Sequence, residues 1–192
     1  MKHAPHPLRT LLVGAGRIAR RHITALAQLP EHFSLVGLVD PRFGDGELEQ
    51  NQGDVWLASL PRYTSFDADL LAHHAPDLVV LCSPSGIHHA QAHLALSSGA
   101  HVLCEKPVAL SSAALHDLLS LASRSRRLLI PAHQTRTYPC FTHLRRWLHH
   151  DHLLGQLHTV NLSLQLSRPQ SYFDEVPWRG SRSQDGGVLW NQ

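Results

Sequence analysis

Lysine is almost missing from this chain of 192 residues, which contains two lysines, Lys2 and Lys106, against 15 arginines. The formal net charge is +2, and no tract of basic residues stands out. Binding to nucleic acid or to an anionic membrane surface depends on concentrated positive charge. The composition therefore argues against both classes of partner, and it makes each lysine conspicuous.

Long apolar runs and an even set of cysteines are also missing. Apolar runs such as Leu78–Cys82 are far shorter than the roughly 20 residues of a membrane-spanning helix. The first residues carry no apolar core of a secretory signal peptide. The three cysteines are an odd number, and two of them lie within apolar runs, as is typical of reduced, buried thiols. We therefore expect a globular cytoplasmic protein, not a secreted, membrane or disordered one.

The sequence does contain a regular alternation of short apolar runs with amphipathic stretches. The apolar runs predict strands covered on both faces, over Leu8–Val13, Phe33–Val39, Leu78–Cys82, His101–Cys104 and Leu128–Ala132. The amphipathic stretches predict helices over Ile18–Leu29, Asp67–His74, Ile87–Ser98 and Ser112–Ser123. The less regular segment from Gly44 to Arg62 predicts one helix and a short edge strand. This order is typical of an α/β fold with a Rossmann-type doubly wound parallel sheet, which we place at residues 1–132.

The pattern changes after Pro139. A helix is predicted over Pro139–His149, and strict alternation over Leu157–Leu166 predicts a half-exposed antiparallel strand. We therefore assign residues 133–192 to the beginning of an incomplete α+β domain with an antiparallel sheet. An apolar strand face without its neighbours favours pairing with another chain, so we expect a homo-oligomer through this sheet.

A glycine-rich turn joins the first predicted strand to the first helix. Gly14, Gly16 and Ala19 form the pattern G-x-G-x-x-A, which in this position binds the pyrophosphate of a dinucleotide. The second strand ends in Asp40, where an acidic side chain binds ribose hydroxyls. Taken separately, the glycines could simply permit a tight turn, and Asp40 could simply be the first residue of a turn. Together they predict a dinucleotide site.

The choice between the two nicotinamide cofactors depends on two neighbouring side chains. The Asp40 carboxylate would repel a 2′-phosphate, which favours NAD, whereas Arg42 could pair with that phosphate, which favours NADP. We expect NAD and keep NADP as the alternative.

Two further motifs follow the apolar runs of the second half of the sheet. Ser83-Pro84 leads to His88, and Glu105-Lys106-Pro107 follows Cys104. Together with the dinucleotide fingerprint and with His133-Gln134-x-Arg136, these motifs resemble the glucose–fructose oxidoreductase/inositol dehydrogenase/rhizopine-catabolism (Gfo/Idh/MocA) family of NAD(P)-dependent oxidoreductases. Three later segments are similar to one subgroup, the bacterial UDP-N-acetyl-2-amino-2-deoxyglucuronate dehydrogenases: Arg168–Tyr172, Trp178–Gly180 and Asp185–Gln192.

This resemblance implies hydride transfer between a sugar or nucleotide-sugar hydroxyl, C3 of a UDP-N-acetylhexosaminuronate, and the nicotinamide, in the biosynthesis of surface polysaccharide such as lipopolysaccharide. It places the catalytic residue at Lys106, because a lysine can take the hydroxyl proton and an arginine cannot. The alternative is a surface lysine paired with Glu105. Implied cofactor contacts are Gly14, Gly16, Arg17, Ile18, Ala19, Asp40, Ser83, Pro84, His88 and Glu105. Implied substrate contacts are Lys106, Arg179 and Asn191.

Two function classes stay open at this point. The resemblance implies a further histidine and most of the substrate-domain sheet beyond Gln192, so we expect a C-terminally truncated chain that is a poor catalyst by itself. One class is a nucleotide-sugar dehydrogenase, and the other is a non-catalytic dinucleotide-binding protein or accessory subunit. No metal is expected, because His89 and His93 lack the three or four converging ligands of a zinc site.

Overall fold

The computed structural model describes residues 6–44, 60–151 and 153–191. Its centre is a sheet of six parallel strands in the order β3-β2-β1-β4-β5-β6. The strands span Leu8–Val13 (β1), Phe33–Val39 (β2), Arg62–Tyr63 (β3), Leu78–Leu81 (β4), His101–Glu105 (β5) and Leu129–Ala132 (β6). The order reverses between β1 and β4, and in such sheets ligands bind outside the carboxyl ends of the strands at this point.

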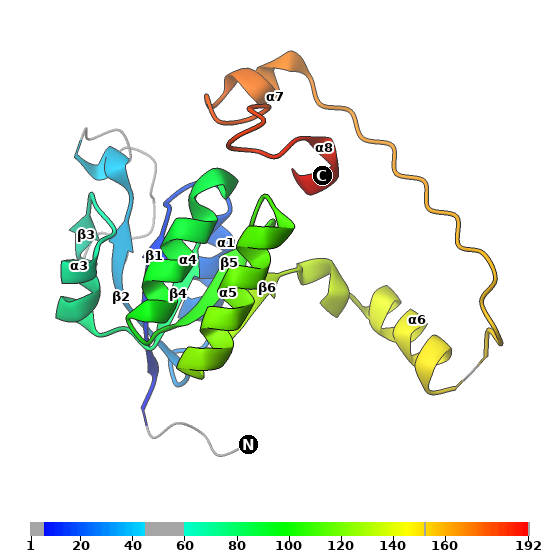
Figure 1. Cartoon of the computed structure of the whole chain (residues 1–192), viewed down its shortest axis with the longest axis horizontal. Helices are drawn as coiled ribbons and strands as arrows, with labels where there is room; N and C mark the ends of the chain where they lie inside the picture. Colours follow the sequence, from blue (N-terminus) through cyan, green and yellow to red (C-terminus); the bar gives the residue numbers. More distant parts are fainter. Residues whose placement is uncertain (1–5, 45–59, 152, 192) are drawn as a thin grey trace.

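Helices cover both faces of this sheet (Figure 1). They are α1 (Ala19–Ala27), α3 (Ala68–His74), α4 (His88–Ser97) and α5 (Ser112–Ser125). On one face α3, α4 and α5 contribute Leu71, Leu96 and Leu118 to a buried cluster. On the other face α1 contributes Ile23 to a second cluster. Because successive strand residues point to opposite faces, the strands supply both clusters, which explains the consecutive apolar residues of β1 at Leu11–Val13 and of β4 at Leu78–Leu81.

The Rossmann-type fold predicted from the sequence is confirmed. β1 and β2 have the predicted bounds, and the ends of the other predicted sheet strands and their helices differ by one or two residues. The predicted edge strand is β3, at Arg62–Tyr63. The helix predicted between Gly44 and Arg62 lies outside the described residues.

The chain after β6 leaves the sheet. The helix α6 (Pro139–His149) has its predicted bounds, projects away from the Rossmann domain and buries none of its residues (Figure 1). Residues 157–169 then run back without regular secondary structure, and Leu162 is 92% exposed. The antiparallel strand predicted over Leu157–Leu166 is therefore wrong for the structure as described. A strand is held by hydrogen bonds to a neighbouring strand, and no strand in the described part of the chain accompanies this segment.

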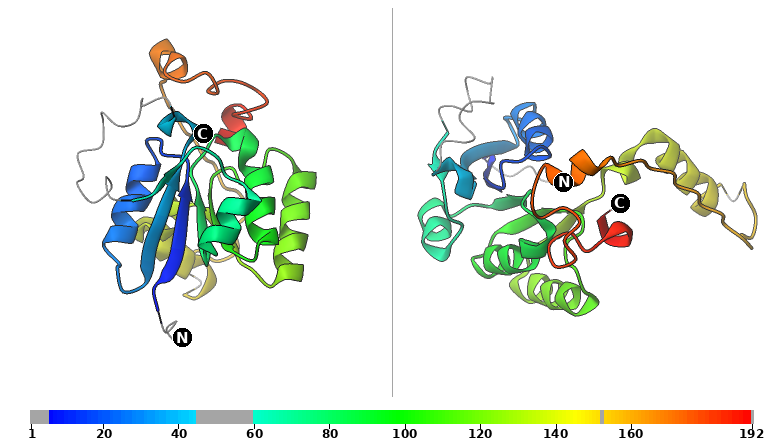
Figure 2. Two further views of the ribbon diagram at one scale, coloured as in Figure 1. Left: turned by 90° about the vertical axis from the view of Figure 1, so that its left-hand side faces the viewer. Right: turned by 90° about the horizontal axis from the view of Figure 1, so that it is seen from above.

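The last segment returns to the sheet. It contains α7 (Gln170–Asp174) and α8 (Val188–Asn191), and it lies over the carboxyl ends of the strands (Figure 2). The backbone amide of Gly86, which follows β4, donates to the carbonyl oxygen of Gln184 at 2.9 Å. Among the described residues, no helix combines the length and the apolar character that crossing a membrane requires.

Candidate active site

The turn between β1 and α1 has the shape that a dinucleotide requires. Gly14 has a φ of +90°, and a Cβ atom on it would lie 2.6 Å from the carbonyl carbon of Cys82 and 2.6 Å from the amide nitrogen of Ser83. A Cβ atom on Gly16 would meet no atom within 4 Å. The first position therefore demands glycine for the fold, whereas the second leaves open space beside the start of α1. This space fits a pyrophosphate, so the residues present fit a bound dinucleotide.

Asp40 lies at the carboxyl end of β2, next to this turn, and is 5% exposed. Its Oδ2 accepts hydrogen bonds from the Ala15 amide and from Arg42 Nη2, both at 2.8 Å. Its Oδ1 accepts from the Arg42 amide at 3.0 Å and from Arg42 Nε at 2.9 Å. Burial raises the pKa of Asp40, but the hydrogen bonds from Arg42 and Ala15 outweigh it and keep the pKa below its ordinary value. The side chain is thus a charged acceptor beside the glycine turn.

The residues around this turn divide into two groups. The side chain of Arg17 is 65% exposed and points to the C-terminal segment, where its Nη2 lies 3.0 Å from Glu175 Oε2. Ile18 and Ala19 instead pack into the core cluster under α1. Any cofactor contact of these two residues is therefore expected from their backbone, at the helix start, and not from their side chains.

The loop after β4 is supported from beneath by His88. The ring is 1% exposed, with Nδ1 2.7 Å from the Pro107 carbonyl oxygen and Nε2 2.8 Å from the Ser83 carbonyl oxygen. Burial lowers the pKa of His88 despite these two oxygens, so the neutral ring can donate to one of them. The predicted cofactor contact of His88 is therefore corrected: the ring joins two loops. Ser83 and Pro84 remain half-buried at the carboxyl end of β4.

Glu105 and Lys106, at the carboxyl end of β5, have different partners. Glu105 is 7% exposed, and its Oε1 accepts from His22 Nε2 at 2.8 Å and from Gln134 Nε2 at 3.0 Å. Lys106 Nζ donates to the backbone carbonyl and to the side-chain Oδ1 of Asn191, the latter at 3.1 Å. The alternative of a lysine paired with Glu105 is thus not what the structure contains.

Asn191 is itself held by a buried carboxylate. Asp185 is 5% exposed, and it accepts hydrogen bonds from the Asn191 side-chain amide and, at 3.0 Å, from the Gly180 backbone amide. Because a carboxylate can only accept, it fixes the Asn191 amide group with Nδ2 toward Asp185 and Oδ1 toward Lys106. The structure therefore brings together Lys106 and Asn191, two of the residues that the resemblance implies as substrate contacts, and Asp185 orients the pair.

Arg179 does not join this group. Its side chain is 9% exposed and forms an ion pair with Glu175. Its Nη1 donates to the Tyr172 carbonyl oxygen at 2.7 Å, and its guanidinium stacks on the Tyr172 ring at 4.3 Å. The predicted substrate contact of Arg179 is therefore corrected to a role inside its own segment, because its charge is already compensated there.

Two residues of the site were missed by sequence reasoning. His22 lies in α1, 83 positions before Glu105, and Asp185 lies six positions before Asn191. His22 lies within the helix predicted over Ile18–Leu29, but no sequence pattern links it to Glu105. Asp185 begins the segment Asp185–Gln192, whose resemblance to known dehydrogenases does not indicate a contact between Asp185 and Asn191.

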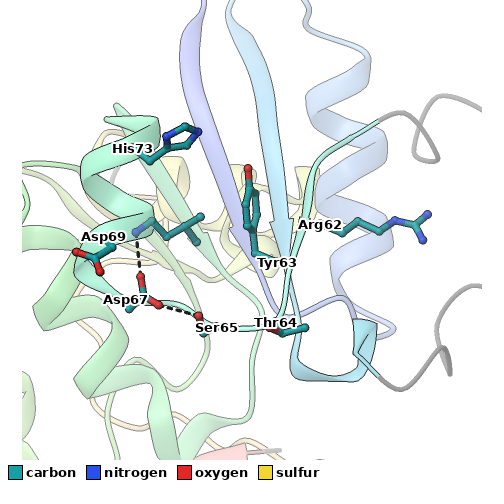
Figure 3. A pocket seen from close by; sticks show the side chains of 8 residues that line it. Arg62, Tyr63, Thr64, Ser65, Asp67, Asp69 and His73 are labelled. Atoms are coloured by element: carbon teal, nitrogen blue, oxygen red, sulfur yellow. Dashed lines mark hydrogen bonds between the residues drawn. The ribbon is translucent and has the colours of Figure 1, made fainter.

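Other polar features lie apart from this group. A cavity of about 430 Å³ lies between β3 and α3, lined by Tyr63, Asp67 and His73 among others (Figure 3). There Asp67 already accepts hydrogen bonds from Ser65 Oγ and, as the cap of α3, from the Leu70 amide. Within the described part of the chain no group of histidine, cysteine or acidic side chains could hold a metal ion. Cys104 is fully buried, and this burial raises the pKa of its thiol far above the ordinary value, as is typical of a structural cysteine.

The chain is similar to known proteins over much of its length. The sequence model of the Gfo/Idh/MocA family, described as an oxidoreductase family with an NAD-binding Rossmann fold, matches residues 8–133. D-glucoside 3-dehydrogenase of Escherichia coli is 30% identical over 124 residues, 64% of this chain and 34% of that protein. UDP-N-acetylglucosamine 3-dehydrogenase of Acidithiobacillus ferrooxidans is 29% identical over 140 residues, 72% of this chain and 41% of that protein.

A solved structure extends the likeness to the C-terminal segment. The WlbA dehydrogenase of Bordetella pertussis, solved in complex with NADH and UDP-GlcNAcA, superposes with a TM-score of 0.86 at 28% identity. The superposition covers 97% of this chain and 56% of that one. The chain thus spans about half of the length of this relative, and less of the two enzymes above.

Proposed function

Because this chain belongs to the Gfo/Idh/MocA oxidoreductase family, with its NAD-binding Rossmann fold over residues 8–133, we propose that it serves an NAD-dependent dehydrogenase that oxidises a hydroxyl of a nucleotide sugar. The observation that carries the proposal is the meeting of Lys106 with Asn191 at the same sheet edge as Gly16 and Asp40. That edge then offers a cofactor site and a proton-accepting group side by side. Residues 133–192 are proposed to begin the substrate domain.

The proposed cofactor site lies at the carboxyl ends of the strands, where the two halves of the sheet meet. Gly14 permits the tight turn, Gly16 leaves the space for the pyrophosphate, and the charged Asp40 accepts from ribose hydroxyls, as acidic residues do at this position. The Arg42 guanidinium donates to the Asp40 carboxylate and so is directed to that carboxylate, not to a 2′-phosphate, which supports NAD over NADP. Bound NAD would supply the hydride acceptor that this fold binds.

The chemistry on the protein side is a proton transfer. Lys106 in its neutral form takes the proton of the substrate hydroxyl as the hydride leaves the same carbon. The Asn191 Oδ1, fixed by Asp185, holds Lys106 Nζ in place, so that the amine needs little reorientation before it reacts. Arginine could not replace Lys106 in this role, because its guanidinium does not deprotonate.

The substrate class rests on the relatives. The Bordetella pertussis dehydrogenase was solved with UDP-GlcNAcA, and the Acidithiobacillus ferrooxidans enzyme acts at position 3 of UDP-N-acetylglucosamine. We therefore propose the C3 hydroxyl of a UDP-N-acetylhexosaminuronate as the reacting group. We also propose that the protein acts in the cytoplasm, in the biosynthesis of surface polysaccharide. We further propose that two copies of the chain pair through the second domain.

Calorimetric titration of the purified chain tests the proposal in two steps. NAD+ and NADH should bind, and Gly16→Val should remove binding without unfolding the chain, because the added side chain fills the space of the pyrophosphate. UDP-GlcNAcA should then bind to the NADH complex, and less tightly after Asn191→Leu, whereas free glucose serves as the control sugar.

The outcomes separate the alternatives. A folded wild-type chain that binds neither NAD+ nor NADH contradicts the cofactor assignment. Binding of NADH without any binding of UDP-GlcNAcA contradicts the substrate assignment and favours a dinucleotide-binding protein without this activity.

A further inference from the structure

Glu105 and Lys106 are adjacent and oppositely charged, yet their side chains do not pair. The Glu105 carboxylate receives His22 Nε2 at 2.8 Å and Gln134 Nε2 at 3.0 Å. Its contact with Lys106 is made by the lysine backbone amide, at 3.3 Å, and not by the ammonium group. Lys106 Nζ is directed to Asn191.

Strand geometry explains how this separation starts. Successive residues of a strand point to opposite faces, and Cys104 belongs to the core cluster under α4 and α5. Glu105 therefore points to the opposite face, where α1 runs. His22 is presented from α1, with its side chain 15% exposed against 8% for Glu105. The buried carboxylate thus finds its hydrogen bonds on the α1 side.

Without the hydrogen bonds from His22 and Gln134, the Glu105 carboxylate would be more stable if it turned toward a positive charge. A buried carboxylate that loses a hydrogen bond is costly, and the nearest cation along the chain is the Lys106 ammonium. An opposite charge beside an amine favours the charged form, and a charged amine accepts no proton. A Glu105–Lys106 ion pair would therefore oppose the proton transfer assigned to Lys106.

We propose that His22 is a positioning residue, which with Gln134 holds the Glu105 carboxylate on the α1 face and so keeps it from forming an ion pair with Lys106. This role rests on the proposed function of Lys106 as proton acceptor. It also links the helix of the dinucleotide turn to the part of the sheet that carries the reacting group.

The scarcity of lysine makes the inference measurable. The chain has two lysines, so acetylation by an amine-reactive ester such as sulfosuccinimidyl acetate can be followed residue by residue with mass spectrometry, and Lys2 serves as the internal reference. Such esters react with the neutral amine alone. His22→Leu, alone and with Gln134→Leu, should slow the acetylation of Lys106 about threefold to tenfold, as a new neighbouring carboxylate favours the charged amine.

Three further variants define the cause. His22→Gln keeps a donor to Glu105 and should restore most of the wild-type rate. His22→Leu combined with Glu105→Gln removes the charge that could pair, and should also return the rate to that of the wild type. The matched control is His89→Leu, which breaks another histidine–carboxylate contact, with Asp117 at 2.9 Å, between more exposed side chains.

The direction of the change distinguishes positioning from support of the fold. If His22 only stabilised the structure, its replacement would loosen the region, and Lys106 would be acetylated faster than in the wild type. Faster acetylation of Lys106 in His22→Leu would therefore contradict the proposal. Faster acetylation after Glu105→Gln alone also contradicts it, because it would mean that the pair already exists in the wild type. The assay needs no cofactor or sugar, so failure of NADH binding tests the proposed function and leaves this result separate.

Discussion

The two glycines of the dinucleotide turn should respond in opposite ways to the same substitution. Gly14→Ala should destabilise the fold, because its Cβ atom would lie 2.6 Å from two backbone atoms of the β4 loop and its φ is +90°. Gly16→Ala should leave the fold intact, because its Cβ atom meets nothing within 4 Å. It should instead weaken the binding of NAD+, since that open space is where the pyrophosphate belongs.

The magnitudes follow from the two environments. At Gly14 the left-handed backbone costs about 1–3 kcal/mol for alanine. The overlap with backbone, which cannot rotate away, adds about 1–3 kcal/mol. The free energy of unfolding should therefore fall by several kcal/mol, a large part of the roughly 5–15 kcal/mol typical of a domain. At Gly16 the change in unfolding free energy should stay within about 1 kcal/mol, and it can be a gain.

The assay is urea denaturation followed by far-ultraviolet circular dichroism, with NADH calorimetry on each variant that folds. The reasoning would be refuted by a Gly14→Ala variant that unfolds at the wild-type urea concentration. It would equally be refuted by a Gly16→Ala variant that binds NADH as tightly as the wild type.

Two further predictions concern charge. Asp40→Ser should raise the affinity for NADP+ relative to NAD+ by about tenfold, because the Arg42 guanidinium can then face a 2′-phosphate; comparative calorimetry checks this, and adding Arg42→Ala should cancel the gain. Burial lowers the pKa of three histidines in the folded chain, His74, His88 and His101. Below the ordinary pKa of histidine, the unfolded chain therefore binds more protons than the folded chain. The free energy of unfolding should therefore fall as the pH drops below about 6.5, by up to about 1.4 kcal/mol per histidine and pH unit, as urea titrations at several pH values would show; a pH-independent value across that range would contradict it.

The sheet could be predicted from the sequence because its signals are local. β1 and β2 are predominantly apolar runs that end at Gly14 and Asp40, residues that terminate a strand for reasons of their own. The glycine pattern and the Glu105-Lys106-Pro107 motif placed the site at the carboxyl edge for the same reason. These features depend on neighbours within a few positions.

The unpredicted features depend on partners far along the chain. His22 contacts Glu105 across 83 positions, and no periodicity encodes such a pair. His88 was expected at the surface of the site, but its burial is decided by the carbonyl oxygens of Ser83 and Pro107 on two separate loops. The alternation over Leu157–Leu166 predicts a strand that this described segment does not form, because a strand also needs a neighbouring strand and the alternation carries no information about one.

The last segment of the chain docks on the sheet, and this docking is an equilibrium separate from the folding of the sheet itself. Closing the chain of about 50 residues between β6 and Gln184 costs about 3.5 kcal/mol in loop entropy. The polar contacts that oppose this cost include Gly86 with Gln184 and Lys106 with Asn191, each adding about 0.5–1.5 kcal/mol, whereas the exposed ion pair of Arg17 with Glu175 is screened by solvent. Cost and gain are similar, so the segment can open while the six strands stay paired. In hydrogen exchange the Gly86 amide should therefore exchange much earlier than the amides of β4, and ligands that bridge the two parts should protect it.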